Sequence, residues 1–191
     1  MKLIFATNNK HKLEEIAKSL DNKFELLSLS DIGFNEEIPE THDSLEENSR
    51  EKAYHIFNKY NTNVFADDTG LEIDALNGEP GVYSARYAGE HCSFQDNMDL
   101  VREKLEGIEN RKARFRTVIT LILEGKEFQF EGIVNGEITT TEHGEKGFGY
   151  DPIFRPSSYK ETFAEMSLEL KNEISHRGLA VKKLLDFLEK L

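Results

Sequence analysis

Two adjacent carboxylates, Asp67 and Asp68, follow the short apolar run Val64-Phe65-Ala66 and precede Thr69-Gly70. Successive side chains of a strand point to opposite faces, so one carboxylate can reach a ligand while the other stabilises a turn. A carboxylate in such a position binds Mg²⁺ or accepts a proton from water. The segment predicts metal-assisted or general-base chemistry, with an ordinary acidic turn as the alternative.

A second polar segment, Thr-Asn-Asn-Lys-His-Lys at residues 7–12, lies where a predicted strand ends and a predicted helix begins. The free N–H groups and the dipole of a helix N-terminus favour an anion, and the two lysines add positive charge. The Gly-rich spacing of a Walker loop is missing. The segment predicts a phosphate contact, or else a plain strand-to-helix turn capped by Asn9.

Two further segments combine unusual residue types. Ser-His-Arg-Gly at residues 175–178 places two cationic side chains in the first turn of the last predicted helix, where positive charge opposes the helix dipole. Such a local conflict indicates a functional site, unless the pair is merely tolerated on the surface. Gly-Phe-Gly-Tyr-Asp-Pro at residues 147–152 lets the backbone approach a flat ligand, and Phe148 can stack on a base. Aromatic core residues in a Gly-rich loop are the alternative.

The elements that position these segments are predicted from hydrophobic spacing and capping signals. Ser44 and Glu47 form a capping-box pattern, and the helix that it opens carries Asn48 and Lys52 on one side. The predicted strands are 3–6, 24–27 and 64–66, and a hairpin joins 113–123 to 128–138. The predicted helices are 44–60, 94–105 and 167–172, together with a first helix that follows Asn9 and has its apolar positions at 13–20 and a last helix that follows Ser175 and has its apolar positions at 179–191. The pattern predicts an α/β fold with a mixed sheet flanked by helices, in one domain over residues 1–191.

Composition excludes several classes of protein. The chain of 191 residues has 36 acidic and 24 basic side chains, a formal net charge of −12, which argues against a nucleic-acid polymer as partner. Its one cysteine, Cys92, excludes an internal disulfide and a Cys-rich zinc site. Since no run of about 18 apolar residues occurs, we expect no membrane partner and a cytoplasmic location.

Taken in order, six segments resemble one family, the inosine/xanthosine triphosphate pyrophosphatases, which remove noncanonical purine nucleotides. The matching segments are residues 6–12, Glu40-Thr41 with Glu47-Asn48, and residues 66–71, 80–86, 147–154 and 175–178. The resemblance covers essentially the whole chain. It implies a two-lobed mixed α/β fold with a cleft between the lobes, a homodimer, and Mg²⁺-dependent hydrolysis of ITP, dITP or XTP to the monophosphate and pyrophosphate. Such an activity prevents incorporation of these nucleotides into DNA and RNA.

The resemblance also implies roles for individual residues. Asp68 matches the catalytic base and metal carboxylate, and Glu40 matches a second metal ligand. Substrate contacts are implied for the segment Thr7, Asn8, Asn9, Lys10, His11 and Lys12, for Thr69, for Phe148, Gly149, Tyr150 and Asp151, and for Lys171, His176 and Arg177. Asn48 and Lys52 are predicted to assist on the phosphate side. Many members have Gly in place of Asn8 and Ser in place of Thr69.

Base selection follows from hydrogen bonding. Inosine and xanthosine present a 6-keto acceptor, which donors such as His176 or Arg177 satisfy, whereas adenine presents an amino donor at that position. Two other functions stay open. One is a nucleotide-binding sensor without catalysis, and the other is a dimeric aspartic protease built on Asp68-Thr69-Gly70.

Overall fold

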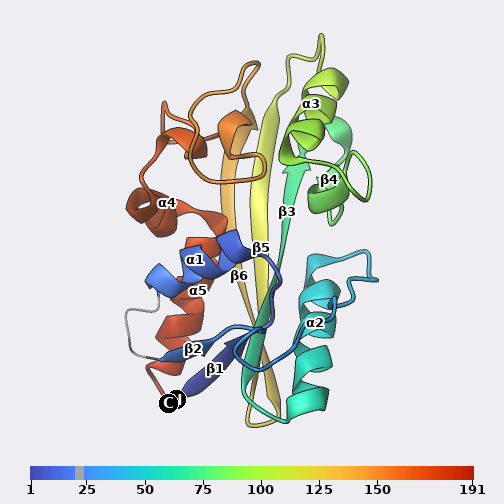
Figure 1. Ribbon diagram of the computed structural model, residues 1–191. Helices are drawn as coiled ribbons and strands as arrows, with labels where there is room; N and C mark the ends of the chain where they lie inside the picture. The colour runs from blue at the N-terminus through green and yellow to red at the C-terminus, as the bar shows by residue number, and fades with distance from the viewer. Residues whose placement is uncertain (20–23) are drawn as a thin grey trace. The chain divides into compact units, whose positions relative to one another are not determined.

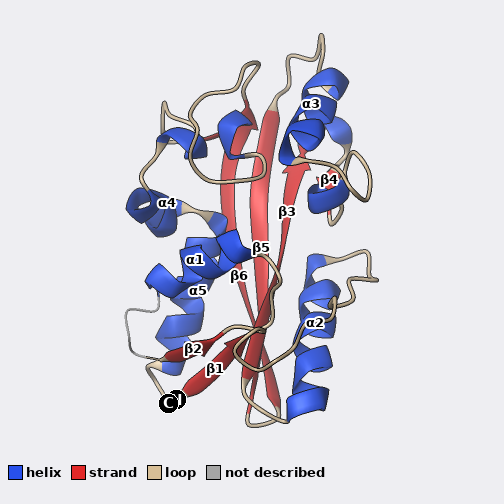
Figure 2. Cartoon of the chain, viewed as in Figure 1, coloured by secondary structure: helices blue, strands red, loops and turns tan. Residues whose placement is uncertain are grey.

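The computed structural model describes residues 1–19 and 24–191, so the predicted end of the first helix at residues 20–22 lies outside the described residues (Figures 1 and 2). The helices are α1 Lys10–Ser19, α2 Leu45–Tyr60, α3 Phe94–Lys104, α4 Leu168–Ile174 and α5 His176–Leu188. The strands are β1 Lys2–Phe5, β2 Glu25–Leu27, β3 Val64–Ile73, β4 Pro80–Gly81, β5 Lys112–Leu123, β6 Lys126–Ile138 and β7 Phe154–Pro156.

The strands form a mixed sheet, which confirms the predicted α/β class. They hydrogen-bond in the order β2-β1-β3-β5-β6-β7, with β4 paired to β3 off this path. β1 is parallel to both β2 and β3, whereas β4 is antiparallel to β3 and β7 is antiparallel to β6. The chain divides into two compact units. Unit 1 comprises Met1–Asp68, Thr117–Gly132 and Arg177–Leu191, and unit 2 comprises Thr69–Arg116 and Ile133–His176.

In unit 1 both faces of the sheet are apolar, and helices cover them (Figure 1). Strand alternation sends Phe5 and Phe65 to one face, where their rings stack at 4.7 Å against residues of α1 and α5. Ile4 and Val64 point to the opposite face, where they pack with Ala53 and Ile56 of α2. The two faces therefore receive different helices, and this difference decides the partners of the acidic residues that follow in β3.

Unit 2 has its own core, built around Phe115, Phe154 and Phe163 with apolar residues of α3. In this unit β3 and β4 approach closely, and a Cβ on Gly70 would lie 2.7 Å from the carbonyl oxygen of Gly81. Only glycine fits at position 70, because any larger residue would separate the two strands. Gly70, which follows the predicted strand 64–66 and is typical of a turn, instead lies within β3.

The long hairpin is confirmed, and one strand differs from its prediction. Glu124 and Gly125 connect β5 to β6 with φ values of 50° and 76°, the left-handed geometry of a two-residue turn. The strand predicted over residues 64–66 is wrong in length, because β3 continues through both aspartates to Ile73. Ion pairs on both faces of β3 accommodate the charged side chains that the sequence pattern assigned to a turn.

Candidate active site

Asp67 and Asp68 lie side by side in β3, and their carboxylates point to opposite faces of the sheet. Asp67 follows Phe65 on the α1 and α5 face, whereas Asp68 follows Ala66 on the α2 face. Both are buried, with exposed fractions of 1% and 5%. Each carboxylate consequently has its own set of partners in unit 1.

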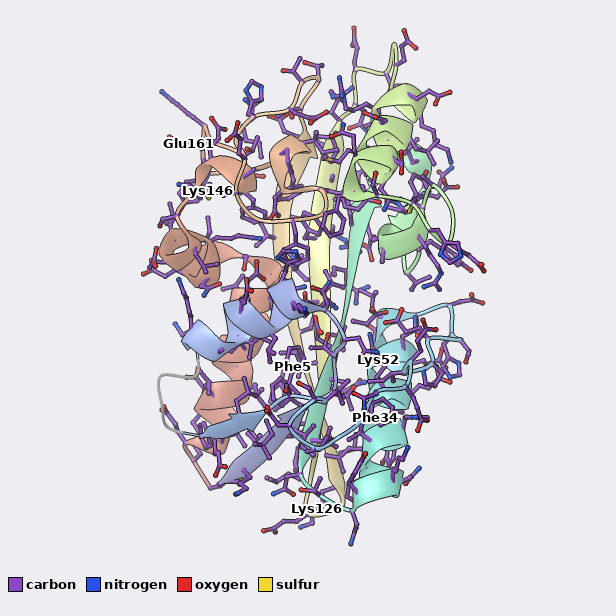
Figure 3. All side chains as sticks on the ribbon, in the orientation of Figure 1. Phe5, Phe34, Lys52, Lys126, Lys146 and Glu161 are labelled. Atoms are coloured by element: carbon purple, nitrogen blue, oxygen red, sulfur yellow. The ribbon has the colours of Figure 1, made fainter. Side chains whose placement is uncertain are left out.

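On the α2 face, the predicted catalytic carboxylate meets the two α2 residues predicted to help it. Asn48 Nδ2 donates to Asp68 Oδ2 at 3.2 Å, and Lys52 Nζ donates to Asp68 Oδ1 at 3.3 Å. Lys52, labelled in Figure 3, also donates to Glu40 Oε1 at 2.5 Å. One ammonium group thus contacts both carboxylates that the family resemblance assigns to a metal ion.

Burial dominates the electrostatics of Asp68. It raises the pKa of the Asp68 carboxyl, and the carboxylates of Glu40 and Asp67 add to this, while Lys52 and Lys12 oppose it. Burial by itself lowers the pKa of Lys52, yet the surrounding carboxylates raise it above its ordinary value. Asp68 is therefore a stronger proton acceptor than an exposed aspartate, beside a lysine that stays charged.

On the other face, Asp67 is the centre of a buried ion cluster. Lys12 Nζ of α1 lies 3.1 and 3.0 Å from its two oxygens, and Arg177 Nε of α5 donates to it at 3.4 Å. Arg177 also donates to the buried carboxylate of Glu15. Burial disfavours the charge, but Lys12 and Arg177 overcome it and hold the pKa of Asp67 far below its ordinary value. Two of the predicted substrate contacts thus pair with a carboxylate of the protein.

The segment of residues 7–12 forms the predicted turn between β1 and α1. Thr7 Oγ1 accepts from Asn9 N at 3.1 Å, and Asn9 Oδ1 accepts from the backbone N–H groups of His11 and Lys12 at 3.0 and 3.3 Å. Asn9 therefore caps α1 with its side-chain oxygen. Asn8, Lys10 and His11 are exposed, and Asn8 donates to the carbonyl oxygen of Glu36 at 3.3 Å.

In unit 2 the Gly-rich loop is folded around Asp151. Asp151 Oδ2 accepts from Phe148 N at 2.8 Å and from Lys171 Nζ at 2.6 Å. Gly147 has φ 75°, and a Cβ there would lie 2.0 Å from this same carboxylate oxygen. The Lys171 ammonium lies 5.0 Å from the centre of the half-buried Phe148 ring, a cation–π contact. The structure thus joins three predicted site residues from two segments.

The other predicted residues of unit 2 occupy different surroundings. His176 is buried and stacks on Phe115, with ring centroids 4.4 Å apart. Tyr150 is a core residue whose hydroxyl donates to the carbonyl oxygen of Ser84 at 2.8 Å, and burial raises its pKa. Gly149 has a positive φ of 62°, and Thr69 is half-buried in β3.

The two neighbouring buried aspartates and their lysine partners occur in a chain that matches a known protein family. The model described as the Ham1 family matches residues 3–187. The chain belongs to the Ham1 family. The dITP/XTP pyrophosphatase of Flavobacterium johnsoniae is 56% identical to it over 98% of each chain. The dITP/XTP pyrophosphatase of Bacillus subtilis is 46% identical over 97% of this chain and 96% of its own.

Solved structures support the same assignment to the Ham1 family. The Ham1 protein of Staphylococcus aureus superposes with a TM-score of 0.90 at 38% identity, over 100% of this chain and 99% of its own. A nucleoside-triphosphatase / dITP/XTP pyrophosphatase of Mycobacterium abscessus gives a TM-score of 0.78 at 41% identity, over 97% and 99% of the two chains. The family resemblance read from the six segments is confirmed.

In this Ham1 chain the buried cluster includes two carboxylates that were not predicted as site residues, Glu15 and Asp67. Glu15 lies three positions after Lys12 on α1, the spacing that places two side chains on one helix face, and this is the signal that identifies it. The sequence pattern predicted only that one of the two aspartates stabilises a turn. The part of Asp67 in the cluster could not be predicted, because Arg177 is 110 positions away.

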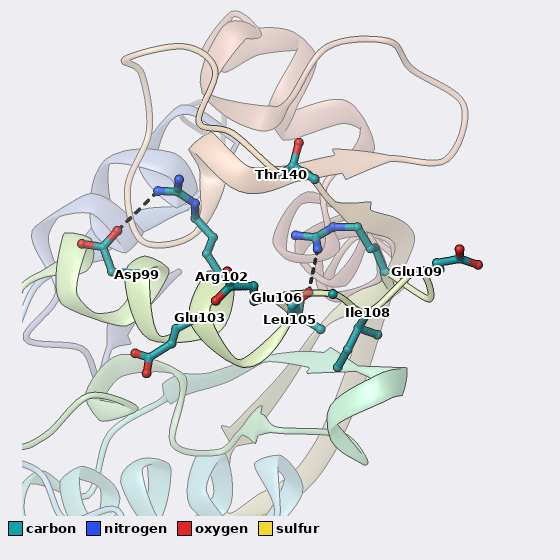
Figure 4. A pocket seen from close by; sticks show the side chains of 10 residues that line it. Asp99, Arg102, Glu103, Leu105, Glu106, Ile108, Glu109 and Thr140 are labelled. Carbon is teal, nitrogen blue, oxygen red and sulfur yellow. Dashed lines mark hydrogen bonds and ion pairs between the residues drawn. The ribbon is translucent and has the colours of Figure 1, made fainter.

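The Ham1 chain also has a groove apart from the predicted residues, in unit 2, with a volume of about 720 Å³ (Figure 4). Arg111 donates to the backbone carbonyls of Ile138, Leu105 and Thr139, so its guanidinium is engaged in structure. The charged lining residues are Asp99, Glu103, Glu106, Glu109, Arg102 and Arg111. Because carboxylates exceed cations here, the groove does not suit a triphosphate.

The described part of the chain has neither a membrane-crossing helix nor a dedicated metal cage. None of its helices has the length and apolar content needed to span a bilayer. Among residues 1–19 and 24–191 there is also no group of three or more His, Cys, Asp or Glu side chains arranged to hold a metal ion.

Proposed function

We propose that this Ham1 chain is a nucleoside triphosphate pyrophosphatase acting on the noncanonical purine nucleotides ITP, dITP and XTP, which keeps them from entering DNA and RNA. The observation that carries the proposal is the contact of a single cation, Lys52 Nζ, with both Glu40 and Asp68. Such a carboxylate pair beside lysines suits a metal–triphosphate substrate. The names of the similar dITP/XTP pyrophosphatases support the substrate class.

The residues present fit a magnesium ion. Mg²⁺ commonly binds one or two carboxylates together with substrate phosphates, and Glu40 and Asp68 supply two carboxylates around a position that already accommodates positive charge. Bound there, Mg²⁺ would neutralise phosphate charge and polarise the phosphorus–oxygen bonds. Magnesium is thus the metal that we propose for Glu40 and Asp68.

The reaction needs a proton acceptor and compensation of phosphate charge. The oxygen of water bonds to the α-phosphorus, the bond from this phosphorus to the oxygen bridging the α- and β-phosphates breaks, and pyrophosphate leaves. Asp68 is placed to accept the proton of that water, since burial raises its pKa while Asn48 and Lys52 orient its two oxygens. Lys52, which contacts Asp68, supplies positive charge toward the phosphates, and the charge of Lys12, although paired with Asp67, also acts on Asp68.

We propose that the nucleobase binds at Phe148, with Lys171 and Asp151 beside it. Hydrogen-bond donors of the segment that contains His176 and Arg177 would bind its 6-keto group. The fixed loop around Asp151 gives Phe148 a defined orientation, which suits a ring that stacks on a base. The remaining substrate contacts proposed by resemblance are Thr7, Asn8, Asn9, Lys10, His11, Thr69, Gly149 and Tyr150. A homodimer and a cytoplasmic location also remain predictions.

Replacing Phe148 with leucine should weaken nucleotide binding while the chain still folds, because leucine fills apolar space but cannot stack. Since a base–aromatic stack contributes about 1–3 kcal/mol, we expect KM for XTP to rise roughly 5- to 150-fold with a smaller change in kcat. Steady-state kinetics measure this. Phe128→Leu, an aromatic residue of the unit 1 core, is the matched control. An unchanged KM in the Phe148 variant would remove the stacking assignment.

The proposal is tested by pyrophosphate release from ITP, dITP, XTP, GTP and ATP in the presence of Mg²⁺. We expect turnover of the first three and little of ATP or GTP. Equal rates on all five would remove the specificity. Saturable binding without any product would favour the nucleotide sensor instead. The dimeric aspartic protease finds no support, since the fold is α/β and Asp68 contacts a lysine.

A further inference from the structure

The chain between β2 and α2, which carries Glu40, has neither helix nor strand over residues 28–44. A carboxylate on such a segment keeps a fixed position only if its neighbours are held. Three consecutive residues of this segment bind α2: Glu40 accepts from Lys52, Thr41 donates to Glu51, and His42 donates to Asn48. Hydrogen bonds therefore attach this segment to α2 next to the carboxylates of Glu40 and Asp68.

Glu51 makes the larger share of these contacts. Its Oε2 accepts from the backbone N–H of Thr41 at 2.9 Å, and its Oε1 accepts from the Thr41 hydroxyl at 2.9 Å. Both bonds go to an ionised acceptor, which makes them stronger than bonds between neutral groups. Asn48 Oδ1 accepts from His42 N at 2.9 Å, while its Nδ2 donates to Asp68. Glu51 and Asn48 thus hold the residues that follow Glu40 in the chain.

Resting on the function proposed above, we propose that Glu51 is a positioning residue that fixes Glu40 opposite Asp68 and so sets the affinity of the site for Mg²⁺. Glu51 does this through two hydrogen bonds to Thr41, and neither of these bonds involves Glu40 or Asp68. Groups that hydrogen-bond directly to metal ligands change metal affinity or activity by about 10- to 100-fold when they are replaced, and because Glu51 acts one residue further away, through Thr41, we expect an effect at the lower end of this range.

The test compares Glu51→Ala with Glu51→Gln. Alanine removes both bonds, whereas the glutamine oxygen still accepts from Thr41 N and its amide group can donate to the Thr41 hydroxyl. In Glu51→Ala we expect the Mg²⁺ concentration for half-maximal hydrolysis of XTP to rise about tenfold. The backbone amide of Thr41 should also exchange with deuterium about tenfold faster in the absence of nucleotide and metal. Glu51→Gln should restore both values to near those of the unsubstituted protein.

Glu36→Ala is the matched control, because it removes an exposed ion pair of the same segment with α2, between Glu36 and Lys59 at 2.6 Å. It should change the Mg²⁺ requirement by less than about twofold. A glutamine variant as impaired as the alanine variant would overturn the proposal, since Glu51 would then act through its charge. An unchanged Mg²⁺ requirement or unchanged Thr41 exchange in Glu51→Ala would overturn it too. If the unsubstituted protein did not hydrolyse XTP, the proposed function would fail, whereas faster Thr41 exchange in Glu51→Ala would still support the positioning of Glu40 by Glu51.

Discussion

Replacing Asp68 with asparagine is expected to lower kcat for XTP by roughly 10²- to 10⁴-fold, the usual contribution of a positioned general base. Asparagine has nearly the same shape as aspartate, and its oxygen can still accept from Asn48 or Lys52. What it lacks is the negative charge that accepts a proton and binds a metal ion. Because the side chain is buried with a raised pKa, the fold loses little when this charge is removed.

The measurement is single-turnover and steady-state hydrolysis of XTP at saturating Mg²⁺, together with thermal unfolding of each variant. Asp186→Asn is the matched control, since it makes the same substitution at an exposed position of α5. The control should keep its turnover. Full activity in Asp68→Asn would show that the base lies elsewhere.

Replacing Arg177 with methionine is expected to destabilise the fold strongly. Arg177 is 3% exposed and donates to both Asp67 and Glu15, so the change leaves two buried carboxylates facing an apolar side chain. Removal of one member of a buried ion pair lowers the free energy of unfolding by about 3–5 kcal/mol. For a chain of this length, that loss corresponds to a fall in Tm of roughly 6–20 °C.

Two comparisons isolate the buried charge as the cause. Arg50→Met breaks the partly exposed pair between Arg50 and Glu127 and should reduce the free energy of unfolding by less than about 1 kcal/mol. Adding Glu15→Gln to Arg177→Met should recover part of the lost stability, because the Glu15 side chain is then neutral, while Asp67 keeps its contact with Lys12. Denaturant unfolding gives these values. An Arg177→Met loss no larger than that of Arg50→Met would contradict the buried cluster.

Local signals in the sequence predicted most elements. Ser44 caps α2 through Glu47 N at 3.2 Å, as its capping-box pattern predicts, and the Glu124-Gly125 turn joins the two long strands. The length of β3 was not predictable in this way, because Asp, Thr and Gly are common turn formers. Residues distant in sequence decide the outcome, since ion pairs on both faces let β3 continue through the acidic residues.

The sequence predicted candidate site residues but not the pairs that they form. Asn48 and Lys52 face Asp68 together, which their helical spacing predicts. Lys12 and Arg177 were predicted to contact the substrate, whereas in the structure both bind Asp67. Which aspartate they bind follows from strand alternation and from the helix that covers each face of the sheet. The pair of Arg177 with Glu15 joins positions 162 residues apart. No local pattern in the sequence specifies such a contact.

The position of bond cleavage tests the central claim most directly. Hydrolysis of XTP by the unsubstituted protein with Mg²⁺ can be followed by phosphorus NMR, which separates the possible products. We predict one xanthosine monophosphate and one pyrophosphate for each XTP consumed, with Asp68→Asn forming neither at a comparable rate. Formation of the diphosphate and orthophosphate, or an absence of any hydrolysis, would contradict the claim.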